Sequence, residues 1–567
     1  MKRNHCIICI FLILFCSCFL FTGALAAQPG TDTGEYPTEG ELGNGFTWKL
    51  TDHTLVISGT GDMPEGSFPW NTNHGSYLSW STLQDSIHAL QIEPGVTGIS
   101  KSAFSSLHKL VQVSLPESLT SIGQSAFAGC HILPAITLPE NLTHIGESAF
   151  AQCNRLEQIV VPAGVTQIQP DTFRECTLLS HVELSPETTV IGHRAFEGCR
   201  ALTQILLPPG ITTIGDGAFL GCAALTEITL PDGLSVLGQE AFRNCASISS
   251  ISLPAGIRSV AFGTFAGCSA LRQVVLPDYL RSIGAHAFEE CSSLQAISLP
   301  DGLQELGDNA FFASGLSSII LPESIISLPS RIFQNCQNLA SVTLSPHTQH
   351  IGSYAFQDCT ALTSIEIPAS VLGIDASAFY NCSNLKQVHI SDLSAWIDIR
   401  FWGEYGNPLS NGAALYLQGE QLTDLVIPEG SQFVRDFVFY GCSWLNSVVI
   451  PEGVTDILPS AFENCTNLTS ITLPASMRTI HSRAFNGCTR LEQFIFNGTP
   501  EQLQQIRAYD GNDVVLAAQW QMAPDKMVSY VVKTVLPIAL VYLVVYGGTI
   551  AVCFILEWRQ RKTGFRY

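Results

Sequence analysis

The segment Ile145-Gly146-Glu-Ser-Ala149-Phe150-Ala-Gln-Cys153-Asn-Arg-Leu156-Glu-Gln-Ile159-Val-Val161-Pro162 recurs along most of the 567-residue chain. Its consensus is Ile-Gly-x-x-Ala-Phe-x-x-Cys-x-x-Leu-x-x-Ile-x-Leu-Pro. Successive copies are 23 residues apart, apart from one step of 22 and one longer interruption, and each contains one phenylalanine. These are Phe104, Phe127, Phe150, Phe173, Phe196, Phe219, Phe242, Phe265, Phe288, Phe311, Phe333, Phe356, Phe379, Phe439, Phe462 and Phe485. A repeat of this length with leucine-type positions is typical of a solenoid.

Within each copy, the segment Leu-x-x-Ile-x-Leu alternates at its end with a period of two, which predicts a short strand with its apolar side chains inward. The following proline ends the strand, and the glycine of the Ile-Gly pair marks a second corner. One copy buries too little apolar surface to fold alone. We therefore predict an α/β-type solenoid for residues 87–390 and 422–496, with one long parallel β-sheet and short irregular or helical convex segments.

The last outward-facing position of each predicted strand forms a column rich in hydroxyl and β-branched residues. Its members include Ser114, Thr137, Val160, Glu183, Leu206, Thr229, Ser252, Val275, Ser298, Ile320, Thr343, Glu366, His389, Val426, Val449 and Thr472. Two interpretations stay open. The composition suits any exposed sheet, and it also suits a broad, low-charge face that docks an extended partner.

The N-terminus has the features of a secretory signal. Lys2 and Arg3 precede an apolar run, and Ala24-Leu25-Ala26 provides a small-residue cleavage site, which predicts a signal peptide over residues 1–26. A lipoprotein signal is the alternative, although bulky residues lie before Cys16 where small ones are expected. Either interpretation places the repeats outside the cell.

Residues 534–558 are apolar apart from Glu557 and are long enough to span the hydrocarbon core of a bilayer as one helix. The tail 559–567 contains four basic residues, which the positive-inside rule places in the cytoplasm. The sequence therefore predicts a single-pass protein of the cell membrane, with an extracellular N-terminal ectodomain and a short cytoplasmic tail. Residues 497–533 are predicted to be a C-terminal cap and juxtamembrane linker.

Charge and motif content narrow the function classes. The chain has 27 Lys and Arg against 48 Asp and Glu, a net charge of −21, which argues against nucleic acid as a partner because phosphate binding needs a basic face. His347-x-x-His350 is the one histidine pair with metal-like spacing, and no acidic or Cys residue lies near it in the sequence. We find no catalytic, cofactor-binding or metal-binding constellation, and we predict a protein that is not an enzyme.

Cysteine usage follows the repeat. Fourteen of the 19 cysteines occupy the position three residues after the repeat phenylalanine, where Leu107 and Ser314 stand in two other copies. A position that also accepts leucine behaves as a small buried hydrophobe, so free buried thiols are expected. Disulfides between neighbouring coils and a metal role are the alternatives.

Two regions depart from the repeat. Residues 391–421 form an irregular coil with Trp396, Phe401, Trp402, Tyr405 and Tyr416. These aromatic side chains either pack a small core of their own or, if exposed, bind sugar rings or a protein partner. Residues 27–86 are predicted to be a β-rich N-terminal cap over the open end of the solenoid, with a separate ligand site as the alternative.

The unit Ala-Phe-x-x-Cys-x-x-Leu-x-x-Ile-x-Leu-Pro resembles the 23-residue leucine-rich repeats of BspA-like surface proteins, over residues 87–496. The resemblance implies a surface-held, adhesin-like protein that binds an extracellular protein, a glycan or other cells. It supplies no residue-level binding motif. The alternatives are a structural envelope protein that self-associates laterally and an enzyme with its site in the N-terminal cap or the irregular coil.

Overall fold

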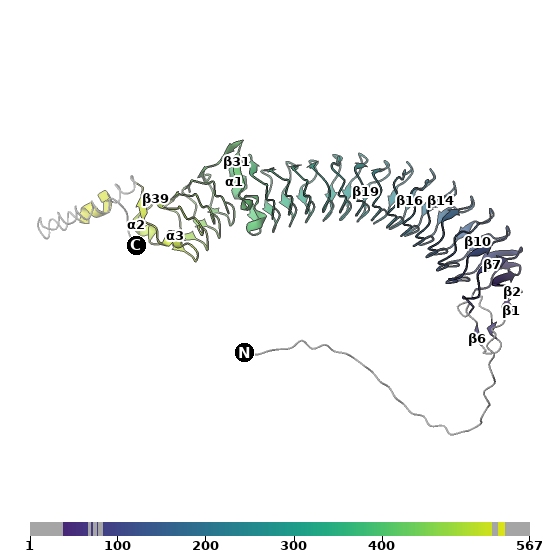
Figure 1. Ribbon diagram of the computed structural model, residues 1–567. Helices are drawn as coiled ribbons and strands as arrows, with labels where there is room; N and C mark the ends of the chain where they lie inside the picture. The colour runs from purple at the N-terminus through teal and green to yellow at the C-terminus, as the bar shows by residue number, and fades with distance from the viewer. Residues whose placement is uncertain (1–37, 66–69, 72–75, 78–82, 524–530, 539–567) are drawn as a thin grey trace, which may run out of the picture.

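The computed structural model describes residues 38–65, 70–71, 76–77, 83–523 and 531–538. Within them the chain winds into a long, curved solenoid with its first coils at one end of the arc and its last coils at the other (Figure 1). The predicted signal 1–26, the tail 559–567 and most of the predicted span 534–558 lie outside the described residues. In the part that is described, no helix is both long and apolar enough to cross a membrane.

The Leu-x-x-Ile-x-Leu segments form a first row of parallel strands. Neighbouring strands pair in a register shifted by one repeat, as in Gln158↔His181, Ile159↔Val182 and Val160↔Glu183. Equivalent side chains therefore stand in columns along the arc. The strands of this row are β9 (Gln112–Ser114), β12 (Gln158–Val160), β14 (His181–Glu183), β18 (Ser250–Ser252), β20 (Gln273–Val275), β23 (Ser318–Ile320), β25 (Ser341–Thr343), β27 (Ser364–Ile367), β29 (Gln387–Ile390), β31 (Ala414–Leu417), β33 (Asp424–Val426), β35 (Ser447–Val449), β37 (Ser470–Leu473), β39 (Gln493–Phe496) and β41 (Trp520–Met522).

A second row of short parallel strands runs through the Ile-Gly corners, and each row is divided into several sheets. The prediction of one long parallel sheet is therefore wrong. Each strand has only two residues and pairs with the same two residues of the adjacent coil, as in Val190↔Thr213 and Ile191↔Ile214. The pairing exists only once coils stack. The strands of this row are β10 (Ser121–Ile122), β11 (His144–Ile145), β13 (Gln167–Ile168), β15 (Val190–Ile191), β16 (Thr213–Ile214), β17 (Val236–Leu237), β19 (Ser259–Val260), β21 (Ser282–Ile283), β22 (Glu305–Leu306), β24 (Ser327–Leu328), β26 (His350–Ile351), β28 (Gly373–Ile374), β30 (Arg400–Phe401), β34 (Phe433–Val434), β36 (Asp456–Ile457), β38 (Thr479–Ile480) and β40 (Arg507–Ala508).

An antiparallel meander covers the N-terminal end. Strand β2 pairs antiparallel with β1 and β3, while β3 pairs parallel with β7 and so begins the first row. Buried Phe46, Trp48, Leu55 and Ile57 join this meander to the main core. Its strands and their neighbours are β1 (Glu39–Gly43), β2 (Phe46–Thr51), β3 (Thr54–Ser58), β4 (Gly61–Asp62), β5 (Trp70–Asn71), β6 (Ser76–Tyr77), β7 (Ala89–Ile92) and β8 (Val96–Ile99).

Helices are few and short in the described residues, and the segments between the two rows in the regular coils are turns. The helices are α1 (Leu393–Ile397), η2 (Glu404–Gly406), η3 (Pro408–Asn411), α2 (Pro500–Leu503), α3 (Asp513–Leu516) and the π-helical turn η4 (Val531–Val535), and β32 (Glu420–Gln421) forms a hairpin with β31. All helices before η4 belong to two non-repeat segments.

Columns of identical side chains fill the core. The repeat phenylalanines are fully buried and stack ring on ring, with centroids 5.4 Å apart for Phe196 and Phe219 and 5.4 Å for Phe219 and Phe242. The fourteen column cysteines are all free and buried. Burial in apolar surroundings raises the pKa of Cys130 and of Cys176 to about 12, so these thiols stay protonated and pack as small hydrophobes.

Candidate functional site

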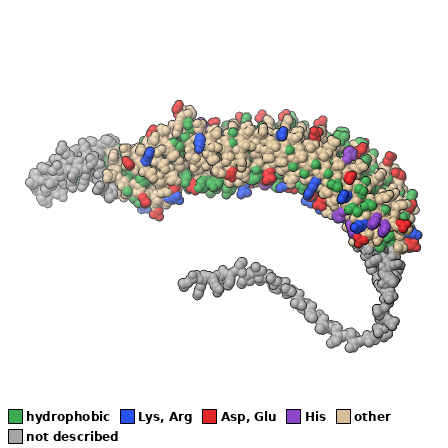
Figure 2. Space-filling view, in the orientation of Figure 1, with side chains coloured by type: hydrophobic (Ala, Val, Ile, Leu, Met, Phe, Trp, Pro, Cys, Tyr) green, Lys and Arg blue, Asp and Glu red, His purple; other side chains and the backbone are tan. Residues whose placement is uncertain are grey.

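The outward face of the first row is a regular surface that runs along the described solenoid. Its last outward column contains strongly exposed aliphatic side chains, including Leu206 at 85% and Ile320 at 71% exposure. From Thr229 to Thr343 this column contains only Thr, Ser, Val and Ile. Figure 2 shows acidic side chains scattered over the visible face rather than gathered in one cluster. The last outward column from Thr229 to Thr343 therefore offers an uncharged row of side chains on an otherwise acidic protein, although the neighbouring outward position of its first coil is the exposed Glu227.

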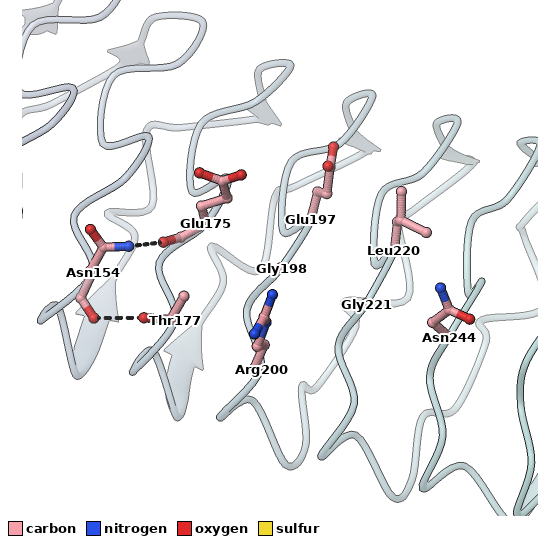
Figure 3. Close-up of a pocket in the computed structure, with 9 residues that line it drawn as sticks. All are labelled: Asn154, Glu175, Thr177, Glu197, Gly198, Arg200, Leu220, Gly221 and Asn244. Carbon is pink, nitrogen blue, oxygen red and sulfur yellow. Dashed lines mark hydrogen bonds between the residues drawn. The ribbon is translucent and has the colours of Figure 1, made fainter.

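A shallow hollow of about 460 Å³ lies on the turns that lead into the first row (Figure 3). It opens where Gly198 and Gly221 replace the side chains that neighbouring coils have at the same position, Glu175 before them and Asn244 after them. Its lining consists of Asn154, Glu175, Thr177, Glu197, Gly198, Arg200, Leu220, Gly221 and Asn244. The sequence analysis missed it, although two successive glycines in one column are visible in the aligned repeats.

Internal contacts already use much of the polar lining of this hollow. Asn154 Nδ2 donates to the main-chain oxygen of Glu175 at 2.9 Å, and Thr177 Oγ1 donates to that of Asn154 at 3.2 Å. Glu197 forms an ion pair with Arg194 at 3.6 Å. Among the described residues, no group of three or more His, Cys, Asp or Glu side chains is placed to hold a metal ion.

The irregular coil lacks the repeat Phe and Cys, and Trp396 and Phe401 form its apolar core instead. Asp392 caps α1 by accepting from the main-chain N–H groups of Ser394 and Ala395. Trp396 and Phe401 are buried with ring centroids 5.4 Å apart, and Phe401 takes the isoleucine position of the second row through the pairing Ile374↔Phe401. These two candidate residues belong to the core.

Asparagine side chains join this coil to its neighbours. Asn411 Nδ2 donates to the main-chain oxygen of Phe379 at 2.8 Å, which is the acceptor that a cysteine thiol would have in a regular coil. The fully buried Asn407 donates from Nδ2 to the main-chain oxygens of Phe437 and Val438, at 2.7 and 3.1 Å. Both strand rows break here, because β31 turns back into β32 and neither β30 nor β31 pairs with a strand of the next coil.

The other three candidate aromatic residues are exposed or half-buried and lie on different elements. Trp402 is 61% exposed and directly follows β30 of the second row. Tyr405 is also exposed and meets the ring of Tyr380 edge-on at 5.0 Å. Tyr416 lies on β31 of the first row, half-buried against His389 with ring centroids 5.0 Å apart. The five predicted residues therefore form no single cluster.

A family model for the BspA type leucine-rich repeat region matches residues 83–203, 189–314, 259–386 and 413–510. The chain belongs to this family. The match covers well over half of the BspA-type repeat protein and leaves out residues 387–412, which contain α1, β30 and the two 3₁₀ turns. No curated protein matches it significantly.

Several solved structures are similar to this BspA-type protein. A leucine-rich repeat protein from Bacteroides ovatus is 25% identical over 85% of this chain and 98% of its own, with a TM-score of 0.45. A leucine rich cell surface protein from Faecalibacterium prausnitzii is 20% identical over 84% of this chain and 100% of its own, with a TM-score of 0.32. A leucine-rich repeat protein from Eubacterium ventriosum is 22% identical over 80% and 95%, with a TM-score of 0.27.

Residues 497–522 of the BspA-type protein, which follow the last regular coil, have the same element order as the irregular coil. Each has a short helix (α1, α2), a two-residue second-row strand (β30, β40), a helical turn (η2 and η3, α3) and a first-row strand (β31, β41). The sequences correspond as well, because Ile399-Arg400 matches Ile506-Arg507 and Gly406-Asn407 matches Gly511-Asn512. Residues 391–417 and 497–522 are thus two versions of one module, one internal and one terminal.

The exposed part of the internal module contains the carboxylate of Glu404 close to two tyrosine side chains. Tyr405 and Tyr440, the latter from the following coil, both interact with the carboxylate of Glu404. The interaction with this carboxylate raises the pKa of Tyr405. Burial, followed by the interaction with Glu404, raises the pKa of Tyr440 to about 12. Both hydroxyl groups therefore stay protonated at neutral pH.

Proposed function

We propose that this BspA-type protein is a non-enzymatic, cell-surface binding protein, anchored by one helix over residues 534–558. Its arc would hold an extracellular protein, glycan or other cell. Family membership supports this role, and the observation that carries it is the last outward column of the first row, which is uncharged from Thr229 to Thr343 and contains strongly exposed aliphatic side chains. Protein interfaces are depleted of charge at their centre and bury apolar side chains there.

The size of the face suits an extended partner. Neighbouring strands are about 4.8 Å apart, so the uncharged part of the last outward column, from Thr229 to Thr343, extends over about 24 Å. A specific interface needs roughly 800 Å² from each partner, and this stretch together with its polar margins is long enough to provide it. Exposed Leu206 extends the same column on one side, whereas Glu366 ends its uncharged part on the other.

The test compares two sets of charge substitutions in the full-length protein. Leu206→Asp and Ile320→Asp alter the first-row face, while Val236→Asp and Leu372→Asp alter similarly exposed aliphatic side chains at the second row. We expect the first pair to reduce binding to an array of extracellular matrix proteins at least tenfold, and the second pair to leave it unchanged. Equal effects of both pairs, or no binding by the unaltered protein, would contradict the proposal.

Lateral self-association is the second candidate, and the same exposed aliphatic column favours it. Sedimentation of the purified protein separates the two. A concentration-dependent assembly that Leu206→Asp and Ile320→Asp abolish, without binding to any foreign protein, would support a structural envelope role instead.

A further inference from the structure

The two copies of the non-repeat module place an aromatic side chain at the same outward position. Trp402 and Tyr509 each follow the two-residue strand of the second row and donate their main-chain N–H to an isoleucine carbonyl of the preceding coil, Trp402 to Ile374 at 3.0 Å and Tyr509 to Ile480 at 2.9 Å. Gly146 makes the equivalent bond in a regular coil. Both aromatic side chains therefore occupy the corner where the early repeats have glycine.

Both rings are available to solvent, with Trp402 61% and Tyr509 49% exposed. Each is followed within two residues by a carboxylate, Glu404 in one module and Asp510 in the other. An exposed indole has no role in packing the coil, because Trp396 and Phe401 already fill that core. A large exposed ring next to a carboxylate, present in both modules, indicates recognition.

We propose that the surface around Trp402 binds neutral glycans, and that Tyr509 forms a weaker second site of the same kind. The inference rests on the proposed binding function and narrows its ligand class. The C–H face of a pyranose ring packs on an aromatic face, while its hydroxyl groups need hydrogen-bond acceptors and donors. The internal module supplies the indole of Trp402, the ring of Tyr405 and the carboxylate of Glu404.

Charge selects among glycans. The chain carries a net charge of −21, and Glu404 lies two residues after Trp402. Two arginines lie near this module: Arg400, which is exposed two residues before Trp402 on β30, and Arg435, which is paired with Asp398 at 3.7 Å and lies over the ring of Phe433. The net negative charge of the chain disfavours sulfated or carboxylated polysaccharides, so a neutral hexose or pentose polymer is the expected ligand.

The stronger site is the internal one, because three coils contribute to it. Tyr380 from the preceding coil meets Tyr405 edge-on, and Tyr440 from the following coil interacts with the carboxylate of Glu404. Asn464 Nδ2 in turn donates to the Tyr440 hydroxyl at 3.3 Å. At the terminal module, Tyr509 stacks on His481 with ring centroids 5.7 Å apart, which leaves less of its ring for a ligand.

The experiment measures retention of the full-length protein on immobilised mannan, xylan and β-1,3-glucan, with heparin as the anionic comparison. We expect saturable binding to at least one neutral polymer, a loss of at least tenfold with Trp402→Ala, and a smaller loss with Tyr509→Ala. Glu404→Gln, which preserves the shape of the module, should weaken binding severalfold. Tyr279→Ala is the matched control, since Tyr279 is as exposed as Trp402 but lies on a regular coil.

The outcomes separate this inference from the proposed function. Binding of matrix proteins without binding of any neutral polymer, or polymer binding that Trp402→Ala leaves intact, would overturn the glycan site and leave the proposed function standing. A protein partner that depends on Trp402 would also overturn it. Failure to bind either class of ligand would reject both. Thermal unfolding of each variant checks that the arc is folded, and Glu404→Gln keeps the test informative if Trp402→Ala misfolds.

Discussion

The thiol of Cys222 donates a hydrogen bond to the main-chain oxygen of Phe196 in the preceding coil, with Sγ and O 3.2 Å apart. The same bond recurs from Cys130 to Phe104 and onward along the arc. Leu107 stands in the cysteine column of the first repeat, where no earlier repeat phenylalanine can accept such a bond. The cysteine column is therefore a ladder of contacts between coils.

Cys222→Ala should destabilise the solenoid by about 1–2 kcal/mol, because it removes one hydrogen bond and leaves a small cavity. The Phe196 carbonyl still accepts from the Cys199 N–H, so the loss stays moderate. Urea unfolding of the full-length protein measures the change. An unaltered midpoint would show that the thiol contact contributes nothing.

The fourteen column thiols should resist alkylation in the folded protein at neutral pH. Each is buried, and burial raises the pKa of Cys130 to about 12 and of Cys336 to about 11, so little thiolate forms. Maleimide labelling followed by peptide mass spectrometry measures this at each site, with protein unfolded in guanidinium as the control. Rapid labelling without denaturant would contradict the burial.

Stability should fall as the pH rises above 9. The ordinary thiol pKa is 9.0, and burial raises that of folded Cys176 to about 12. The unfolded state therefore releases protons in this window while the folded state keeps them, which costs about 1.4 kcal/mol per thiol for each pH unit. Below pH 9 these thiols should give no pH dependence. Urea unfolding at pH 8, 9 and 10 tests the sign.

Gly238→Ala should destabilise the protein by about 1–3 kcal/mol through overpacking. A Cβ at this corner would lie 2.4 Å from the main-chain nitrogen of Asp216 in the preceding coil. Gly210→Ala is the matched control, since the nearest atom to its Cβ would be 3.7 Å away. Equal unfolding midpoints for the two variants would refute the role of close coil contact.

Asn407→Ala should cost about 2–4 kcal/mol, because it leaves the buried main-chain oxygens of Phe437 and Val438 without their side-chain donor. Hydrogen exchange should rise mainly in the coils on either side of residues 391–421, because the side chain of Asn407 joins this coil to the next one. Asn141→Ala, at an exposed asparagine that bonds one carbonyl, is the control. Uniform exchange along the arc would argue against a local weak point.

The 23-residue period predicted much of this architecture, because it places equivalent side chains of successive coils next to one another. Phe150, Cys153 and Ile159 are buried as their pattern requires. The second row was missed because strands such as Val190–Ile191 are too short to leave a periodic signal and exist only through pairing between coils. In the irregular coil Phe401 is buried and Trp402 is exposed. The repeat pattern could not predict this difference, because this coil does not follow the repeat. Comparison with residues 506–512 would have revealed the duplicated module.

The fixed register between coils makes the reach of this protein adjustable in whole units. Deleting residues 195–217 would join Arg194 to Ala218, which already stands in the column of Ala195, and would shorten the arc by about 4.8 Å. Every remaining stack, thiol bond and glycine corner would find an equivalent partner. Gene variants that gain or lose one such unit would thus change the length of the solenoid and preserve the contacts between adjacent coils. The two non-repeat modules would keep their length.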